Sequence, residues 1–243
     1  MSENRFPTET VELPSKGLLY PSTNPLSSGQ VEMYYMSASS EDILTNQSYI
    51  QKGTVLDKLL ESLIVNKDIK VKDIIVGDKN ALLIAARILG YGKNYTFIYK
   101  GEEQTIDLSV LDNKEFDESL ITKGINSFNF TLPNSGTEIT FKILTGEDES
   151  NIDRELEGLK KINKNLVPEL TTRLKYIITS VNGSNEKKDI REFVDKYLLA
   201  SDSRELRNYI KKIQPDVDMK ITLDSGEEAT LPIALNFFWP DTN

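Results

Sequence analysis

The acidic triplet Glu147-Asp148-Glu149 is the group of side chains in this sequence best placed to do chemistry. Clustered carboxylates can act as general acids and bases, so the triplet raises the possibility of a carboxylate-based hydrolase. It follows Thr145, however, which is a favourable helix N-cap, and negative side chains are stabilised in the first turn of a helix. We therefore interpret the triplet as the start of a long helix.

The run Gly77-Asp78-Lys79-Asn80 is a second candidate, since it looks like part of a phosphate-binding loop. It lacks the Gly-x-x-x-x-Gly-Lys-Ser/Thr spacing that lets backbone N–H groups cradle phosphates. We predict instead that Asp78 caps a helix whose body, residues 81–86, is apolar on all sides and hence central. Arg87 is the charged residue in the otherwise apolar body of this helix, and we expect its side chain to lie at the helix edge, paired with a carboxylate. The alternative is that Arg87 holds a partner.

Composition excludes several classes of chemistry. The 243 residues include no Cys and no His, which excludes cysteine nucleophiles, Ser-His-Asp triads, Cys/His zinc sites and disulfides. A net charge of −9 argues against a primary role on nucleic acid, whose phosphates need a basic surface. Neither a secretory signal nor an apolar run of about 20 residues is found, so we expect an intracellular protein with no membrane partner and no cofactor.

Residues 1–30 are predicted to form an extended arm, because prolines and small polar residues in this stretch disfavour helix. Such an arm could dock on a partner by adding to a sheet or by inserting apolar side chains into a groove. The alternative is an arm that folds back on its own domain. The side chains that would make a partner contact are Leu13, Lys16, Leu18, Leu19 and Tyr20.

The aromatic run Phe237-Phe238-Trp239 near the end of the sequence is a further candidate for partner binding. Large aromatic side chains are frequent hot spots of protein interfaces. A terminal segment that covers its own core is the competing interpretation, and we favour it slightly.

Apolar periodicity and turn residues predict the elements that would position these residues. Antiparallel hairpins are expected at 95–99 with 104–108, at 128–132 with 139–143, and at 219–223 with 229–233, and a strand at 31–36. Helices are expected from about 40, after Thr54, from Asp78 to 90–92, after Thr145, from Pro168 to Val181, around 190–197, and from an N-cap at Asp202 with Glu205 as its capping-box partner. The fold class is α+β, with the arm at 1–30, one domain at 31–112 and another at 113–243.

Several short sequence motifs occur in a fixed order, and through them the chain resembles the baseplate hub assembly proteins, or tail assembly chaperones, of tailed phages with T-even-like contractile tails. The motifs are Leu13-Pro14-Ser15-Lys16-Gly17 with Tyr20-Pro21, Ser40-Glu41-Asp42-Ile43-Leu44, Gly77-Asp78-Lys79-Asn80 with Tyr91-Gly92, Leu144-Thr145-Gly146 and Phe237-Phe238-Trp239-Pro240. The resemblance covers most of the chain. It implies a non-enzymatic protein that binds other tail or hub proteins in the host cytoplasm during assembly.

The chain departs from that family at its hairpin turns. Family members often carry Cys-x-x-Cys pairs there, which would suit a zinc ribbon. The corresponding turns at 100–103 and 224–227 contain no thiol, so no metal is expected.

Two other functions stay open. One is a permanent virion subunit of an oligomeric baseplate ring, in which the chain would form a homo-oligomer. The other, from a different class, is a metal-dependent hydrolase built on carboxylates, which would need converging acidic side chains in a cleft.

Overall fold

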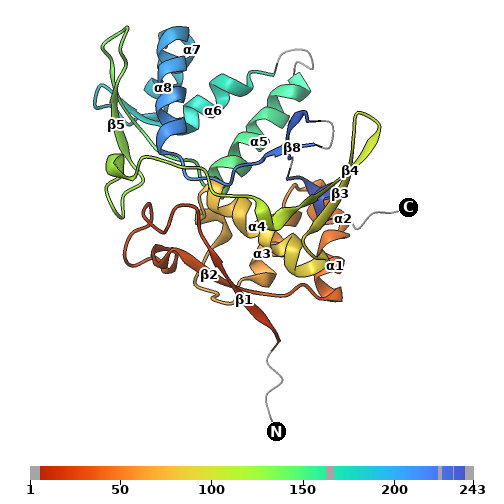
Figure 1. Cartoon of the computed structure of the whole chain (residues 1–243). Helices are drawn as coiled ribbons and strands as arrows, with labels where there is room; N and C mark the ends of the chain where they lie inside the picture. Colours follow the sequence, from red (N-terminus) through yellow and green to blue (C-terminus); the bar gives the residue numbers. More distant parts are fainter. Residues whose placement is uncertain (1–5, 163–166, 224–225, 232, 239–243) are drawn as a thin grey trace. The chain divides into compact units, whose positions relative to one another are not determined.

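The structure, a computed structural model, describes residues 6–162, 167–223, 226–231 and 233–238. Helices and small antiparallel sheets follow one another along the chain, which confirms the α+β class (Figure 1). The chain forms two compact units. Unit 1 comprises residues 1–17, 22–114 and 215–243, and unit 2 comprises residues 18–21 and 115–214.

These units differ from the predicted domains in where the last segment belongs. The predicted boundary at 112–113 lies close to the point where the chain leaves unit 1, but residues 215–243 return to unit 1. The departing and returning segments pair with each other: the Lys114 N–H donates to the Asp216 carbonyl at 2.8 Å, and the Asp218 N–H to the Asp112 carbonyl at 2.7 Å. We call residues 215–218 the return segment. A pairing across a hundred residues leaves no local pattern in the sequence.

The helices of unit 1 follow the predicted apolar stripes. Leu59, Leu60 and Leu63 are buried on the third helix, and residues 81–84 and 86–87 are buried on the fourth, as expected of an apolar central helix. The helices are α1 (Ala38–Leu44), α2 (Gln47–Gln51), α3 (Val55–Leu63) and α4 (Val76–Tyr91), with single 3₁₀ turns at η1 (Pro25–Ser28), η2 (Val71–Asp73), η3 (Leu108–Val110) and η5 (Leu235–Phe238).

The predicted arm contains regular structure. β1 (Thr8–Glu12) pairs antiparallel with β2 (Gln30–Tyr34), so the expectation of an arm without elements is wrong for this stretch. The intervening turn is closed by Leu13, whose N–H donates to the Gly29 carbonyl at 2.9 Å. Prolines flank β1 but do not interrupt it, which is compatible with strand pairing.

Two predicted hairpins of unit 1 are confirmed. β3 (Asn94–Tyr99) pairs with β4 (Glu102–Asp107), and β8 (Lys220–Thr222) pairs with β9 (Glu228–Thr230). Residues 224–225, which belong to the predicted turn of the second hairpin, lie outside the described residues.

Unit 2 contains a three-stranded sheet where the sequence predicted a hairpin. β5 (Phe128–Thr131) and β6 (Glu138–Phe141) pair as expected, and β7 (Ile178–Val181) adds to the other edge of β6. The predicted helix from Pro168 to Val181 therefore ends at Ile177. The β-branched run that follows suits a strand better than a helix, and the Thr140 hydroxyl is hydrogen-bonded to the hydroxyls of Thr179 and Ser180 at 2.8 and 2.7 Å.

The helices of unit 2 cover this sheet with apolar side chains. Phe128 and Phe141 stack with ring centroids 5.3 Å apart, and Ile152, Leu174 and Leu206 are buried. The helices are α5 (Gly146–Ile162), α6 (Glu169–Ile177), α7 (Lys187–Lys196) and α8 (Ala200–Ile213), with a 3₁₀ turn at η4 (Glu118–Leu120).

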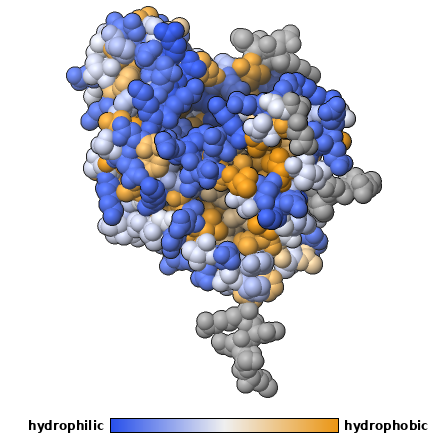
Figure 2. Space-filling view, viewed as in Figure 1, coloured by the Kyte–Doolittle hydropathy of each residue, from blue (hydrophilic) through white to orange (hydrophobic). Residues whose placement is uncertain are grey.

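The two units differ in the surface that they show in one view. Hydrophobic residues gather over α4 in unit 1, whereas the surface over α7 and α8 in unit 2 is mostly hydrophilic (Figure 2). No helix within the described ranges is both long and apolar enough to cross a membrane.

Candidate functional site

Gly77 allows the backbone of α4 to lie directly against the backbone of the return segment. A Cβ placed on this residue would lie 1.9 Å from the Pro215 carbonyl oxygen, far inside any contact that a side chain tolerates. The residue is therefore glycine because two backbones touch there.

Asp78 binds the loop after β1 and lies in the first turn of its helix, not at the N-cap position. It is completely buried, and its carboxylate accepts hydrogen bonds from the Ser15 N–H at 2.9 Å and the Ser15 hydroxyl at 2.6 Å. The helix begins at Val76, with Ile75 at the N-cap position, so the predicted cap at Asp78 is wrong. A buried carboxylate needs donors, and Ser15 supplies them.

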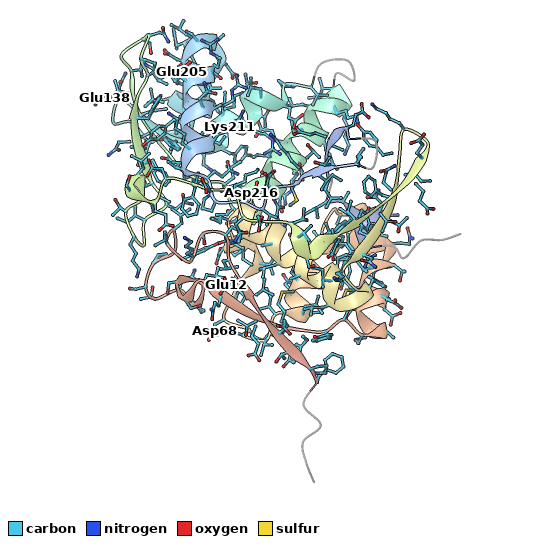
Figure 3. All side chains as sticks on the ribbon, viewed as in Figure 1. Glu12, Asp68, Glu138, Glu205, Lys211 and Asp216 are labelled. Atoms are coloured by element: carbon cyan, nitrogen blue, oxygen red, sulfur yellow. The ribbon has the colours of Figure 1, made fainter. Side chains whose placement is uncertain are left out.

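Lys79 and Asn80 extend the same junction to two more segments. Lys79 forms an ion pair with Asp57 on α3. The Asn80 side-chain amide donates to the carboxylate of Asp216 at 3.0 Å, and Lys114 approaches the same carboxylate at 3.2 Å. Figure 3 labels Asp216. We call residues 77–80 the unit 1 junction. Its polar side chains bind other segments of unit 1, so these residues have a structural role and form what we call a node.

The acidic triplet also has structural partners. Asp148 accepts hydrogen bonds from the Thr145 N–H and hydroxyl, both at 3.0 Å, and lies 2.8 Å from the Lys142 ammonium. Glu149 receives two parallel hydrogen bonds from the Arg173 guanidinium, at 2.7 and 2.8 Å. These contacts agree with the interpretation of the triplet as a helix start, because Asp148 ties the first turn of α5 to the residue before it.

Asp202 repeats in unit 2 the role of Asp78. The helix α8 begins at Ala200 with Leu199 at the N-cap position, so the predicted N-cap at Asp202 is wrong. Its buried carboxylate instead accepts from the N–H and side-chain amide of Asn134, both at 2.8 Å, and from the Ser135 N–H at 3.0 Å. Burial alone would raise the pKa of Asp202, but the hydrogen bonds from Asn134 and Ser135 outweigh burial and lower it.

Arg87 lies inside unit 1, whereas the sequence predicted it at the helix edge. Its side chain is 4% exposed, and its guanidinium lies 4.9 Å from the centroid of the Tyr91 ring. The Nε–H donates to the Phe237 carbonyl at 3.0 Å. Arg87 thus fastens the C-terminal segment to α4.

The C-terminal aromatic side chains are part of the core. Phe237 and Phe238 are buried, and the Phe237 ring lies 4.9 Å from that of Tyr95. This burial favours the interpretation of a terminal segment that covers its own core. Trp239 lies outside the described residues.

The residues predicted for partner contact in the arm are mostly buried as well. Leu13, Leu19 and Tyr20 are each less than 5% exposed, which favours an arm folded on its own chain. Lys16 is exposed and Leu18 is half-buried. A partner contact through these two side chains stays a prediction.

An aromatic pocket in unit 1 was not predicted from the sequence. It has a volume of about 250 Å³ and lies between β2 and the helices α1 and α3. Phe6, Tyr34 and Tyr35 line it together with Ile43 and Leu63, and Phe6 and Tyr35 keep 49% and 36% of their surface exposed. The pair Tyr34-Tyr35 at the end of the predicted strand was the available signal, but only pairing with β1 brings Phe6 beside it.

Beside this pocket, β1 is an edge strand of its sheet. Within the described part of the chain it pairs with β2 alone, whereas β2 also bridges to Ile64 on its other side. An edge strand next to an aromatic pocket is a geometry suited to an extended peptide.

The described residues contain no group of three or more Cys, His, Asp or Glu side chains arranged to hold a metal ion. No family model, no curated protein and no solved structure matches this chain.

Proposed function

We propose that this chain is a non-enzymatic assembly protein of a contractile-tailed phage, and that it binds other tail or baseplate hub proteins. The phage context rests on the sequence resemblance. The binding role rests on the aromatic pocket and its neighbouring edge strand, which together are the single geometric feature that supports it best.

The pocket offers what an anchor residue of a partner needs. Phe6 and Tyr35 present aromatic surface to solvent, and side chains of this kind supply much of the affinity of protein interfaces. The backbone of β1 can add main-chain hydrogen bonds, since its outer edge has no paired strand among the described residues. The partner segment would be extended and would carry an apolar side chain.

The roles of the acidic residues favour binding over hydrolysis. Asp148 and Glu149, the best catalytic candidates, are both engaged by side chains of the chain itself. The same is true of the buried Asp78 and Asp202. In this proposal the chain acts in the host cytoplasm during assembly, and its net charge of −9 opposes self-aggregation.

Co-expression of the tagged chain with the tail and hub proteins of its own genome tests the proposal. We expect pull-down and mass spectrometry to recover a hub or tail protein. Purified virions are examined in parallel, because presence there identifies a permanent subunit and absence identifies a chaperone. Failure to recover any tail protein, together with absence from virions, would overturn the proposal.

A pair of tyrosine variants tests the pocket itself. Tyr35→Ala removes an aromatic wall of the pocket, and Tyr197→Ala removes a tyrosine of unit 2 that is 61% exposed and does not line it. We expect the first variant to lose most of the captured partner and the second to keep it. Equal capture by both would show that the partner binds elsewhere.

A further inference from the structure

Unit 2 contains a second pocket, of about 310 Å³, whose lining is polar. Its lining residues come from the end of β6, the first turns of α5, the end of α6, the start of β7 and the start of α7. The side chains that set its charge are Lys142, Lys175, Lys187, Arg191 and Asp148. Its volume is at the lower end of the range of roughly 300–1,000 Å³ that is typical of ligand sites.

The charge of this lining is opposite to that of the whole chain. Acidic residues outnumber basic ones by 38 to 29 in the sequence, yet four cationic side chains and one carboxylate line the pocket. That carboxylate, Asp148, is already bound by Thr145 and Lys142. The cations come from separate segments, so the fold brings them together.

Ion pairs hold three of the cations in place. Lys142 pairs with Asp148 at 2.8 Å, and Lys175 pairs with Asp195 at 2.7 Å. Arg191 makes two hydrogen bonds to Glu155, at 2.9 and 2.7 Å.

Lys187 differs from the other three cations, because it forms no ion pair with any carboxylate in the part of the chain that the structure describes. The pocket therefore keeps a positive excess even after Glu155 and Asp195 are counted, and three of its four positive side chains are preorganised by their partners. A group with negative charge would gain these interactions without ordering them first.

We propose that this pocket binds the carboxylates of an acidic peptide segment. The inference rests on the proposed function, since it assigns the segment to a partner protein. Lysine and arginine side chains together with the amides of Asn151 and Asn185 supply the donors that carboxylate oxygens need. The volume of the pocket accommodates more than one small oxyanion, which favours a short run of acidic side chains.

A labelled hexaglutamate peptide serves as the probe, with binding to the full chain followed by fluorescence anisotropy at low salt. Lys187→Glu reverses the unpaired charge. Lys188→Glu is the matched control, because Lys188 is the next residue on α7, is also exposed, and does not line the pocket. Glutamate is favourable in the first turn of a helix, so both variants are expected to fold, and circular dichroism verifies this.

We expect Lys187→Glu to weaken hexaglutamate binding about tenfold or more, since attraction becomes repulsion at short range. Lys188→Glu should weaken it less than about threefold, since it changes only the net charge. Equal weakening by both variants, or no binding of hexaglutamate to the unaltered chain, would overturn the proposal. Competition by inorganic phosphate as effective as that by unlabelled hexaglutamate would also overturn it, and would identify a small-oxyanion site.

The same variants separate this inference from the proposed function. Capture of a hub protein by a chain that does not bind hexaglutamate would refute the pocket and leave the assembly role standing. Hexaglutamate binding that depends on Lys187, with no tail protein captured, would refute the assembly role and leave the pocket standing.

Discussion

Units 1 and 2 each contain an aspartate at the third position of a helix that binds a distant loop. In unit 1, Asp78 on α4 receives two hydrogen bonds from Ser15. In unit 2, Asp202 on α8 receives three from Asn134 and Ser135. Both carboxylates are completely buried. In both units, an aspartate in the first turn of a helix thus connects that helix to a loop that is distant in the sequence.

The difference lies in what surrounds each aspartate. Asp78 belongs to the unit 1 junction, where Gly77 and Asn80 contact the return segment and Lys79 contacts α3. The residue next to Asp202 makes no comparable side-chain contact. The Ser203 hydroxyl is buried without a hydrogen-bond partner among the described residues. Unit 1 is assembled from three separate stretches of chain and unit 2 from two. The residues around Asp78 must therefore hold more segments together than the residues around Asp202.

The substitution Gly77→Ala should have the largest effect on this comparison. The new Cβ would collide with the Pro215 carbonyl, and we expect a loss of about 3 kcal/mol in the free energy of unfolding of unit 1. Gly158→Ala is the control, because Gly158 lies within α5 with nothing within 4 Å of its Cβ position. That variant should stabilise unit 2 by about 0.5–1 kcal/mol. Urea unfolding measures both, and equal effects would contradict the close backbone contact.

Asp78→Asn and Asp202→Asn should follow in size. Each change replaces a charged acceptor by an amide that offers one acceptor oxygen, and we expect each to cost about 2 kcal/mol. Hydrogen exchange read by mass spectrometry should show faster exchange in the unit that carries the variant. If Asp78→Asn left the exchange of α4 and of the loop around Ser15 unchanged, the node assigned to unit 1 would be wrong.

A serine pair sharpens the comparison at smaller scale. The Ser15 hydroxyl donates to Asp78 at 2.6 Å. Ser135 donates to Asp202 through its backbone N–H at 3.0 Å, and its side chain contributes less than that of Asn134 to the lowered pKa of Asp202. Ser15→Ala should therefore cost about 1 kcal/mol and Ser135→Ala less than half as much. Thermal unfolding of the two variants measures the difference, and an equal cost would show that side-chain donors do not distinguish the nodes.

The pH dependence of unit 2 should show the smallest effect. The pKa of Asp202 is lowered in the folded chain, so its contribution to stability is present above the pKa of the unfolded state, about 3.9, and is lost as pH falls through the folded value. The stability difference between the unaltered chain and Asp202→Asn should be constant near neutral pH and shrink below about pH 4. A difference that grows on acidification would reverse the assigned direction.

Local patterns were sufficient for the elements whose signal lies within the element itself. The apolar stripe of α3, the apolar body of α4 and the three hairpins were predicted from periodicity and turn residues. The stretch after Ile177 was predicted as a continuation of the helix, since the spacing of its apolar residues fits a helix as well as a strand. Pairing of β7 with β6 decided it as a strand.

The candidate sites were predicted less well, because their residues meet only in three dimensions. The aromatic pocket joins Phe6 to Tyr35 through the pairing of β1 with β2. The basic pocket joins Lys142 to Lys187 across unit 2. Each side chain has an ordinary sequence context, so no spacing along the chain marks either site.

By itself, the sequence determined the α+β class, the hairpins, most helices and the absence of Cys and His chemistry. Composition and short-range periodicity are enough for these conclusions. The tertiary structure alone decided the partners of Asp78 and Asp202 and the membership of residues 215–243 in unit 1. The physical reason is that a carboxylate in the first turn of a helix can accept from its own backbone or from a remote loop. Which donors it takes depends on the segments that the fold brings within hydrogen-bond distance.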